Sequence, residues 1–381
     1  MLKAPELRFP EFTDDWEERK LKDVVEKQIK GKAQFEKLAQ GDVEYLDTSR
    51  LNGGQSILTN GLKDVTLDDI LILWDGSKAG TVYHGFEGAL GSTLKAYRTS
   101  ANSKFVYQYL KRHQDNIYIN YRTPNIPHVQ KDFLNVFTIS VPGSDEQAKI
   151  GSFFKQLDNT IALHQRKLDL LKEQKKGYLQ KMFPKNGAKV PELRFAGFAD
   201  DWEERKLGDL GSVAMNKRIF KEQTTENGEV PFFKIGTFGS EPDAFISREL
   251  FEEYKSKYPY PVIGDILISA SGSIGRTVVY QGKDEYFQDS NIVWLKHDNQ
   301  LDNQFLKQFY SIVKWQGLEG STIKRLYNKN ILDTPISIPT PNEQQKIGSF
   351  FKQLDNTITL HQRKLDLLKE QKKGFLQKMF L

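Results

Sequence analysis

Residues 146–183 read EQAKIGSFFKQLDNTIALHQRKLDLLKEQKKGYLQKMF, and residues 343–380 repeat this stretch with three changes in 38 positions. We call these two stretches the long repeats. Residues along each copy recur at alternating spacings of four and three, a spacing that is typical of a heptad helix. At about 1.5 Å per residue, each copy predicts a helix roughly 57 Å long. The seam consists of Leu157, Ile161, His164, Leu168 and Leu171 in the first copy, and of Leu354, Ile358, His361, Leu365 and Leu368 in the second.

We expect the two helices to bury their seams against each other as an antiparallel coiled coil, because a whole globular segment separates them in the chain. The alternative is that each helix packs on its own globular body. The shared histidine position suggests packing polarity or register rather than a metal ligand.

A second repeat precedes each variable part of the chain. Residues 5–24 read PELRFPEFTDDWEERKLKDV and residues 191–210 read PELRFAGFADDWEERKLGDL, with fifteen of 20 positions identical. We call these the opening repeats. The intervening segments 25–145 and 211–342, the first and second bodies, are hardly alike. Short apolar runs between Gly/Ser turns predict strands, and runs such as 105–110 (FVYQYL) predict short helices.

The predicted fold class is therefore α+β. Two mixed α/β domains in a pseudo-two-fold arrangement would be separated by two long antiparallel helices. The expected boundaries are 1–145 for the first domain, 146–183 for the first helix, 184–190 for a linker, 191–342 for the second domain and 343–381 for the second helix.

Composition excludes several classes of protein. The 381 residues contain no cysteine, so disulfides and thiol nucleophiles are absent, and a reducing, cytoplasmic location is expected. No apolar run suggests a signal peptide or a membrane span. The net charge is +5, and each long repeat carries an excess of four basic residues. The bodies are nearly neutral, so binding of nucleic acid would need basic groups gathered on one face or supplied by a partner. The alternative for the basic repeats is simply solvated helix faces.

Catalytic patterns are missing from the sequence. There is no phosphate-binding glycine loop, and the six histidines show no metal-ligand spacing, so we expect no catalytic residue, no metal and no cofactor on this chain. One loose match is Pro242-Asp243 followed by Glu253 and Lys255, which fits the pattern of Mg²⁺-dependent nucleases. This pattern is short and common by chance, and it lacks the apolar strand that such a site needs.

Polar and aromatic loops remain as candidates for reading DNA bases. Arginine can bridge two acceptors of guanine, asparagine and glutamine can pair with adenine, and lysine, serine and threonine hold phosphates. Each loop taken alone is more often just a turn, but the loops at 120–128 and 320–328 both precede the last predicted strand of their body. The candidates are Lys78, Tyr121, Arg122, Asn125 and His128 in the first body, and Ser273, Arg276, Gln288, Asn291, Lys324, Arg325 and Asn328 in the second.

The duplicated order of these parts resembles the specificity subunit of type I restriction–modification systems over essentially the whole chain. The resemblance is carried by the segments 264–268 (GDILI), 271–277 (SGSIGRT), 320–323 (GSTI), 336–339 (ISIP) and 343–347 (EQQKI). The first half keeps 145–150 (DEQAKI) but has 121–124 (YRTP) where the second has GSTI. Base-reading residues therefore cannot be transferred from one half to the other.

The resemblance implies a non-catalytic subunit with two target-recognition domains. Each would read one half of an asymmetric, bipartite double-stranded DNA site in the major groove, and the helices would set the spacer. The chain would bind two methyltransferase subunits that carry S-adenosylmethionine, and recruit two motor-endonuclease subunits that use ATP and Mg²⁺. The rival hypotheses are a stand-alone DNA-binding regulator, the Mg²⁺-dependent nuclease described above and a structural scaffold.

Overall fold

The computed structural model describes residues 4–125, 127–185, 187–318 and 324–380. The chain divides into two compact units, one comprising Met1–Lys167 with Gln362–Leu381 and the other comprising Leu168–His361. We call them unit 1 and unit 2. Each unit contains one of the variable bodies, the start of one long helix and the end of the other.

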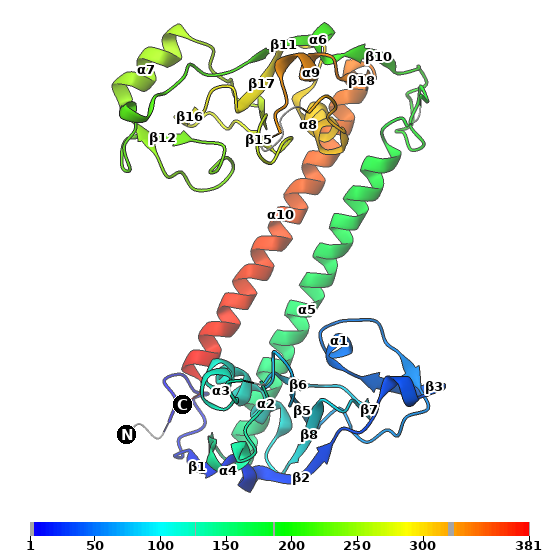
Figure 1. Ribbon diagram of the computed structural model, residues 1–381, viewed down its shortest axis with the longest axis vertical. Helices are drawn as coiled ribbons and strands as arrows, with labels where there is room; N and C mark the ends of the chain where they lie inside the picture. The colour runs from blue at the N-terminus through cyan, green and yellow to red at the C-terminus, as the bar shows by residue number, and fades with distance from the viewer. Residues whose placement is uncertain (1–3, 126, 186, 319–323, 381) are drawn as a thin grey trace. The chain divides into compact units, whose positions relative to one another are not determined.

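Unit 1 is built from a four-stranded sheet in the order β2-β8-β5-β6, a three-stranded sheet in the order β4-β3-β7 and the antiparallel pair β1-β9 (Figure 1). Its strands are β1 (Glu17–Lys20), β2 (Val25–Lys30), β3 (Gln40–Leu46), β4 (Leu58–Thr59), β5 (Ile70–Leu73), β6 (Val82–His84), β7 (Ala89–Leu90), β8 (Leu94–Thr99) and β9 (Thr138–Val141). Its short helices are α1 (Thr48–Leu51), α2 (Ser103–Arg112), α3 (Gln114–Asn120) and α4 (Phe133–Val136).

Unit 2 repeats this plan with a different sequence. Its sheets follow the orders β11-β17-β14-β15 and β13-β12-β16, beside the antiparallel pair β10-β18. Its strands are β10 (Glu203–Lys206), β11 (Gly211–Ala214), β12 (Val230–Phe233), β13 (Phe245–Ile246), β14 (Ile266–Ser269), β15 (Thr277–Val279), β16 (Tyr286–Phe287), β17 (Ile292–His297) and β18 (Pro335–Ile338). Its short helices are α6 (Leu207–Leu210), α7 (Arg248–Lys257), α8 (Asn303–Ile312) and α9 (Asn328–Leu332). The predicted mixed α/β class is confirmed in both bodies.

One of the two inner strands of each four-stranded sheet is buried on both faces. All four residues of β5 (ILIL) and all four of β14 (ILIS) are buried, because helices or the second sheet cover the two sides. This explains why these strands appear in the sequence as continuous apolar runs rather than as an alternating pattern.

The opening repeats lie against the start of the long helices. In unit 1 the Arg8 guanidinium donates two hydrogen bonds of 2.7 Å to the two carboxylate oxygens of Glu146. In unit 2 Arg194 makes the same two bonds, also of 2.7 Å, to Glu343. Both carboxylate oxygens of each glutamate are therefore used by an arginine more than 100 positions away, a bidentate pairing that is stronger than a neutral hydrogen bond.

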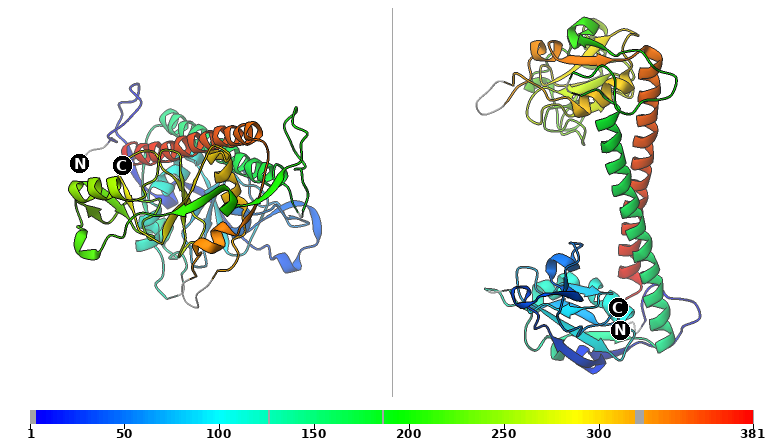
Figure 2. Two further views of the ribbon diagram at one scale, coloured as in Figure 1. Left: turned by 90° about the horizontal axis from the view of Figure 1, so that it is seen from above. Right: turned by 90° about the vertical axis from the view of Figure 1, so that its right-hand side faces the viewer.

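The two long helices are α5 (Ser144–Lys181) and α10 (Pro341–Lys378), each a continuous helix in the views of Figure 2. Within unit 1 the Phe153 and Phe375 rings lie 5.1 Å apart, and Lys372 Nζ lies 2.5 Å from Asp158 Oδ1. Residues further along α5 thus contact residues earlier in α10, so the two helices pair in an antiparallel way.

The same direction holds within unit 2, where the Tyr178 and Phe350 rings lie 5.1 Å apart and Lys175 Nζ lies 2.6 Å from Asp355 Oδ1.

Every seam position is at least partly shielded from solvent. The buried positions are Leu168, Leu171, Leu365 and Leu368, and the half-buried ones are Leu157, Ile161, His164, Leu354, Ile358 and His361.

The end of each long helix also belongs to a body's core. In unit 1 the Phe380 ring packs 6.3 Å from Trp16 and 5.5 Å from Phe105. In unit 2 the Phe183 ring packs 6.0 Å from Trp202 and 5.3 Å from Phe305. Each body is thus anchored to both long helices, through the start of one and the end of the other.

Candidate nucleic-acid interface

Three loops of unit 2 meet at one end of the sheet that contains β14 and β17. The loop after β14 contacts the turn before β17 through a 2.7 Å hydrogen bond from the Ala270 amide to the Asn291 carbonyl. It also pairs with the segment before α9, because the Leu326 amide donates to the Ala270 carbonyl at 2.8 Å and Ser271 forms an isolated β-bridge with Arg325. We call these three segments, 269–276, 288–291 and 324–328, the unit 2 loop cluster.

The loop cluster gathers all seven residues predicted for the second body. The exposed ones are Ser273, Arg276, Lys324, Arg325 and Asn328, and the half-buried ones are Gln288 and Asn291. The segment 320–323 (GSTI), which contributes to the family resemblance, lies outside the described residues.

Three of these side chains already form hydrogen bonds within the protein. Gln288 Oε1 accepts from the Ile235 amide at 2.9 Å, and Arg276 Nη2 donates to the Ile235 carbonyl at 2.9 Å. Asn291 Oδ1 accepts from Ser271 Oγ at 2.7 Å. These bonds hold the side chains in defined positions, as a recognition surface requires.

Ser290 lies in the same cluster and was missed in the sequence. Its φ is 54°, the one left-handed value for a non-glycine among the described residues. The turn is held by a 2.6 Å bond from the Asn291 amide to the Asp289 carbonyl, and Arg218 Nε pairs with Asp289 Oδ2 at 3.0 Å. Such a conformation costs of order 1–3 kcal/mol, and strain of this kind gathers at functional sites. A lone serine gives no sequence signal of this conformation.

In unit 1 the loop after β5 meets the segment 121–130. The Val129 amide donates to the Trp74 carbonyl at 2.9 Å, and the Gly76 amide donates to the Pro127 carbonyl at 2.9 Å. Asp75 and His128 form an isolated β-bridge. The structure therefore brings the two predicted loops of the first body together in the same way.

The five candidate residues of unit 1 differ in how far their side chains are exposed to solvent and free of internal hydrogen bonds. Lys78 and Asn125 are exposed. Arg122 Nε donates to the Tyr118 carbonyl at 2.8 Å, and its Nη1 donates to the Ser77 carbonyl at 3.1 Å. The guanidinium also lies 4.9 Å from the centre of the Tyr118 ring. Arg122 therefore ties the two loops together.

Two other candidates of unit 1 are directed into the protein. The Tyr121 ring packs edge-on against Phe133 and Phe137, with centroids 5.4 Å away from each. This favours a packing role over base contact. His128 Nδ1 lies 3.0 Å from Thr123 Oγ1.

Lys95 was not predicted as a site residue. Its ammonium lies 3.2 Å from the centre of the Trp74 ring. Burial lowers the pKa of Lys95, and the aromatic face compensates by favouring the cation. Only the three-dimensional pairing of β5 with β8 reveals this contact.

The nuclease pattern is not assembled. Glu253 and Lys255 lie on the helix α7 and not on a strand. Lys255 pairs with Asp284 at 3.4 Å, Glu253 with Lys257 at 3.0 Å and Asp243 with Lys234 at 2.9 Å. In the described part of the chain, no group of three or more histidine or acidic side chains is arranged to hold a metal ion.

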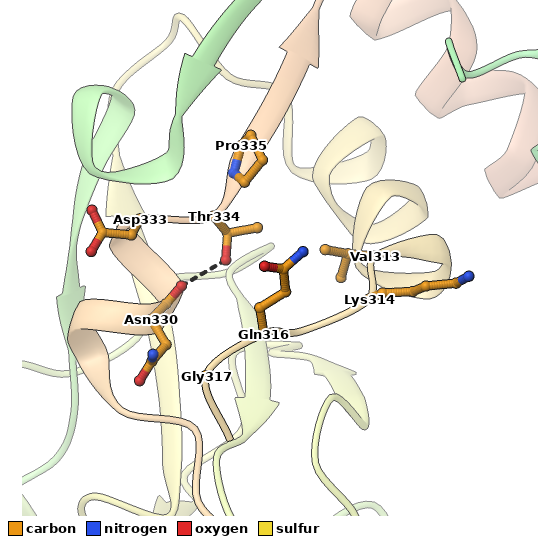
Figure 3. Close-up of a pocket in the computed structure, with 8 residues that line it drawn as sticks. All are labelled: Val313, Lys314, Gln316, Gly317, Asn330, Asp333, Thr334 and Pro335. Carbon is orange, nitrogen blue, oxygen red and sulfur yellow. Dashed lines mark hydrogen bonds between the residues drawn. The ribbon is translucent and has the colours of Figure 1, made fainter. Parts of the chain in front are cut away.

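A pocket of about 480 Å³ lies beside α9 (Figure 3), lined by Val313, Lys314, Gln316, Gly317, Asn330, Asp333, Thr334 and Pro335. Thr334 Oγ1 donates to the Asn330 carbonyl at 2.7 Å, and the Asp333 carboxylate points away from Gln316 and pairs with Lys206 at 3.1 Å. The polar groups of Thr334 and Asp333 therefore serve the local structure.

Among the described residues, no helix is both long enough and apolar enough to cross a membrane.

Comparisons with known proteins match this architecture. The family model described as "Type I restriction modification DNA specificity domain" matches residues 13–173 and 199–370. The MjaVIII specificity subunit of Methanocaldococcus jannaschii is 26% identical over 401 residues, which cover 97% of this chain and 92% of that protein. S.HindORF215P of Haemophilus influenzae, also named as a type I specificity subunit, is 58% identical over 158 residues. That match covers 40% of this chain and 41% of that protein.

Among solved structures, the type I restriction–modification S subunit from M. genitalium covers 99% of both chains with a TM-score of 0.72 at 17% identity. A chain from a study of complex assembly in the type I system matches over 96% of this chain and 97% of its own length, with a TM-score of 0.52 at 16% identity. Because both parts of this chain match the family model and the whole fold matches an S subunit, the chain belongs to the type I restriction modification DNA specificity family, as a non-catalytic DNA-recognition subunit.

Proposed function

We propose that the two bodies read the two halves of an asymmetric, bipartite double-stranded DNA site. The observation that carries this proposal is the contrast between constant and variable parts. The sheet orders are the same in both units, whereas the loop clusters have different residues. The unit 2 loop cluster offers Arg276 and Arg325, and its counterpart in unit 1 offers Lys78 and Asn125. Different side chains on one scaffold suit two different half-sites.

We further propose that α5 and α10 set the length of the unread spacer between the half-sites. A continuous helix is stiff and its length is defined by its residue count. The Phe153–Phe375 contact within unit 1 and the Tyr178–Phe350 contact within unit 2 hold the two helices in a fixed register. The domain boundaries that the sequence suggests, with readers at 1–145 and 191–342, are part of this proposal.

By the same proposal, the chain docks two methyltransferase subunits and, through them, two motor-endonuclease subunits. Its basis is a duplicated apolar surface on the long helices. Leu163 and Leu170 on α5 are 67% and 51% exposed, and Leu360 and Leu367, their counterparts on α10, are 67% and 48% exposed. These leucines lie outside the seam and are spaced seven residues apart on each helix. Identical surfaces suit two copies of one partner.

The chemistry lies with the partners in this proposal. The methyltransferase subunits would carry S-adenosylmethionine and the motor-endonuclease subunits would use ATP and Mg²⁺. This chain would supply recognition and docking, in the cytoplasm where the DNA is.

Methylome sequencing tests the division of labour between the bodies. Cells that carry the complete system are compared with cells in which residues 25–145 are exchanged for those of another specificity subunit. We expect one half-site to change and the other half-site to stay. A change in both half-sites contradicts the proposal. Methylation that does not depend on this chain favours the regulator or scaffold hypotheses instead.

The docking surface has its own test. Leu163→Asp with Leu170→Asp should lower the number of methyltransferase subunits bound per chain, because an ionised carboxylate cannot be buried in an apolar contact. Gln174→Asp, at an exposed position of the same helix, is the matched control. Native mass spectrometry of the reconstituted complex measures the stoichiometry. Full binding by the leucine variant would exclude this surface.

A further inference from the structure

The unit 2 loop cluster and its surroundings contain three guanidinium groups in different situations. Arg218 is held by Asp289 at 3.0 Å. Arg276 donates to the Ile235 carbonyl at 2.9 Å and lies 5.5 Å from the centre of the Phe238 ring. Arg325 is exposed, and across the described ranges its side chain has no hydrogen bond or ion pair. Of the three, Arg325 keeps all its donors for another molecule.

The backbone below Arg325 is firmly placed. Arg325 forms a β-bridge with Ser271, and the next amide, that of Leu326, donates to the Ala270 carbonyl at 2.8 Å. The Leu326 side chain is 3% exposed and belongs to the main core of the unit. The Arg325 side chain therefore starts from a defined point, which lowers the entropy lost on binding.

The neighbouring amides add donors rather than acceptors. The Gln288 oxygen is fixed as an acceptor by the Ile235 amide, because a backbone N–H can only donate. Within the described part of the chain, its Nε2 has no partner. Asn291 Oδ1 accepts from Ser271 Oγ, which leaves the Asn291 Nδ2 hydrogens available as well. The cluster thus presents a set of hydrogen-bond donors.

Guanine is the base that complements such a set. In the major groove guanine offers two acceptors, N7 and O6, whereas adenine offers an acceptor and a donor and cytosine offers a donor. Thymine offers one acceptor beside a methyl group. A free, planar guanidinium matches the guanine pair in a bidentate way.

We propose that Arg325 reads a guanine in the half-site recognised by the second body, with Gln288 and Asn291 as flanking donors. This inference rests on the proposed function and deepens it. Unit 1 has no equivalent, because Arg122 already spends Nε and Nη1 on the carbonyls of Tyr118 and Ser77. The guanine reading that depends on Arg325 therefore belongs to the second half-site only.

The test uses the complete chain assembled with its methyltransferase subunits. Arg325→Lys keeps the charge and removes the bidentate geometry, and Arg325→Gln removes both. Binding is measured on duplexes in which each base pair of the second half-site is varied in turn. Both variants should lower the preference for guanine at one position by about tenfold or more and leave the first half-site unchanged.

Lys324→Gln is the matched control, since Lys324 is the exposed neighbour in the chain. It should weaken binding to all duplexes alike and reduce the salt dependence by about one counterion, without a change in the preferred sequence. Equal thermal unfolding of all variants shows that each one folds.

The outcomes separate the two proposals. An unchanged base preference in both Arg325 variants, or a change in the first half-site, overturns the role of Arg325. If the exchange of residues 25–145 alters one half-site at the same time, the proposed function still stands. If that exchange leaves both half-sites unaltered, the proposed function itself fails.

Discussion

At the scale of single residues, two aspartates at equivalent positions of the two bodies have pKa values that are shifted in opposite directions. Asp69 and Asp265 each precede a buried central strand and accept a hydrogen bond from the backbone three residues earlier, at 2.8 and 2.9 Å. Burial raises the pKa of both, but in Asp69 the hydrogen bonds from Arg98 and Thr66 outweigh burial and its pKa is lowered. Asp265 has no such arginine, and its pKa stays raised. The hydrogen bond from the backbone is shared by both aspartates, and it accounts for the presence of an aspartate before the strand in both bodies.

A residue-scale prediction concerns His84. Burial, assisted by the charge of Lys155, lowers the pKa of His84 to about 4. The unfolded chain binds this proton near the ordinary value of 6.5 and the folded chain does not. The free energy of unfolding should therefore fall as the pH drops from about 6.5 to about 4. In His84→Gln this part of the slope should disappear, as urea unfolding at a series of pH values measures. Parallel curves for the two proteins would show that His84 titrates normally.

At the scale of elements, glycines in the long helices have opposite roles. A β-carbon on Gly151 would lie 2.7 Å from Asn102 Oδ1 and 3.0 Å from the Phe105 amide nitrogen, where α2 begins. A β-carbon on Gly177 would meet nothing within 4 Å. The first glycine permits close packing of two helices, and the second only weakens its own helix.

This contrast predicts opposite effects of the same substitution in α5. Gly177→Ala should raise the free energy of unfolding by about 0.5–1 kcal/mol, the difference in helix propensity. Gly151→Ala should lower it by about 1–3 kcal/mol, because backbone atoms cannot move aside as a flexible side chain would. Denaturant unfolding of the two variants measures both. Stabilisation by both substitutions would mean that α2 can shift away from α5.

The proposed spacer role gives another prediction at this scale. Four residues inserted into the same place of α5 and α10 add about 6 Å of helix, close to two base-pair steps of DNA. We expect the unread spacer to lengthen while both half-sites stay the same, with methylome sequencing as the measurement. Altered half-sites with an unaltered spacer would contradict a role of these helices in spacing.

At the scale of the whole molecule, the same contact between an opening repeat and the end of a long helix occurs twice. In unit 1 the Leu7 amide donates to the Lys378 carbonyl at 2.8 Å, and in unit 2 the Leu193 amide donates to the Lys181 carbonyl at 2.9 Å. The second contact spans the linker 184–190, whereas the first joins the two ends of the chain. Each unit thus completes its core with a helix end followed by an opening repeat, whether or not the chain is continuous there.

A circular permutant is therefore expected to fold. Residues 1–4 and 381 would be replaced by the linker sequence PKNGAKV, and new ends would be opened within 184–190. The melting temperature should stay within a few degrees of the parent, because no core contact changes. A permutant opened between β14 and β15 is the control and should be strongly destabilised. Equal loss of stability in both would mean that the covalent linker 184–190 is essential.

Local and repeated patterns in the sequence were sufficient for part of this picture. The heptad spacing predicted two long helices, because a helical seam depends only on residues three and four positions apart. Short apolar runs such as 70–73 predicted strands for a similarly local reason. The polar loops chosen as candidates for base reading lie next to one another within each unit, but their role in base reading stays a prediction.

The roles of individual side chains in those loops depended on partners far away in the chain. Tyr121 reads as a base-contacting aromatic in the sequence, but it packs on Phe133 and Phe137. Arg276 and Arg325 are equivalent candidates in the sequence. In the structure, Arg276 donates to the Ile235 carbonyl, whereas the Arg325 side chain has no hydrogen-bond partner among the described residues. Repetition and periodicity are properties of the order of residues along the chain, so the sequence by itself determined the duplicated plan, the long helices and the family resemblance. Only the tertiary structure decided which charges are neutralised and which donors remain available, because hydrogen bonds form between residues that folding brings together.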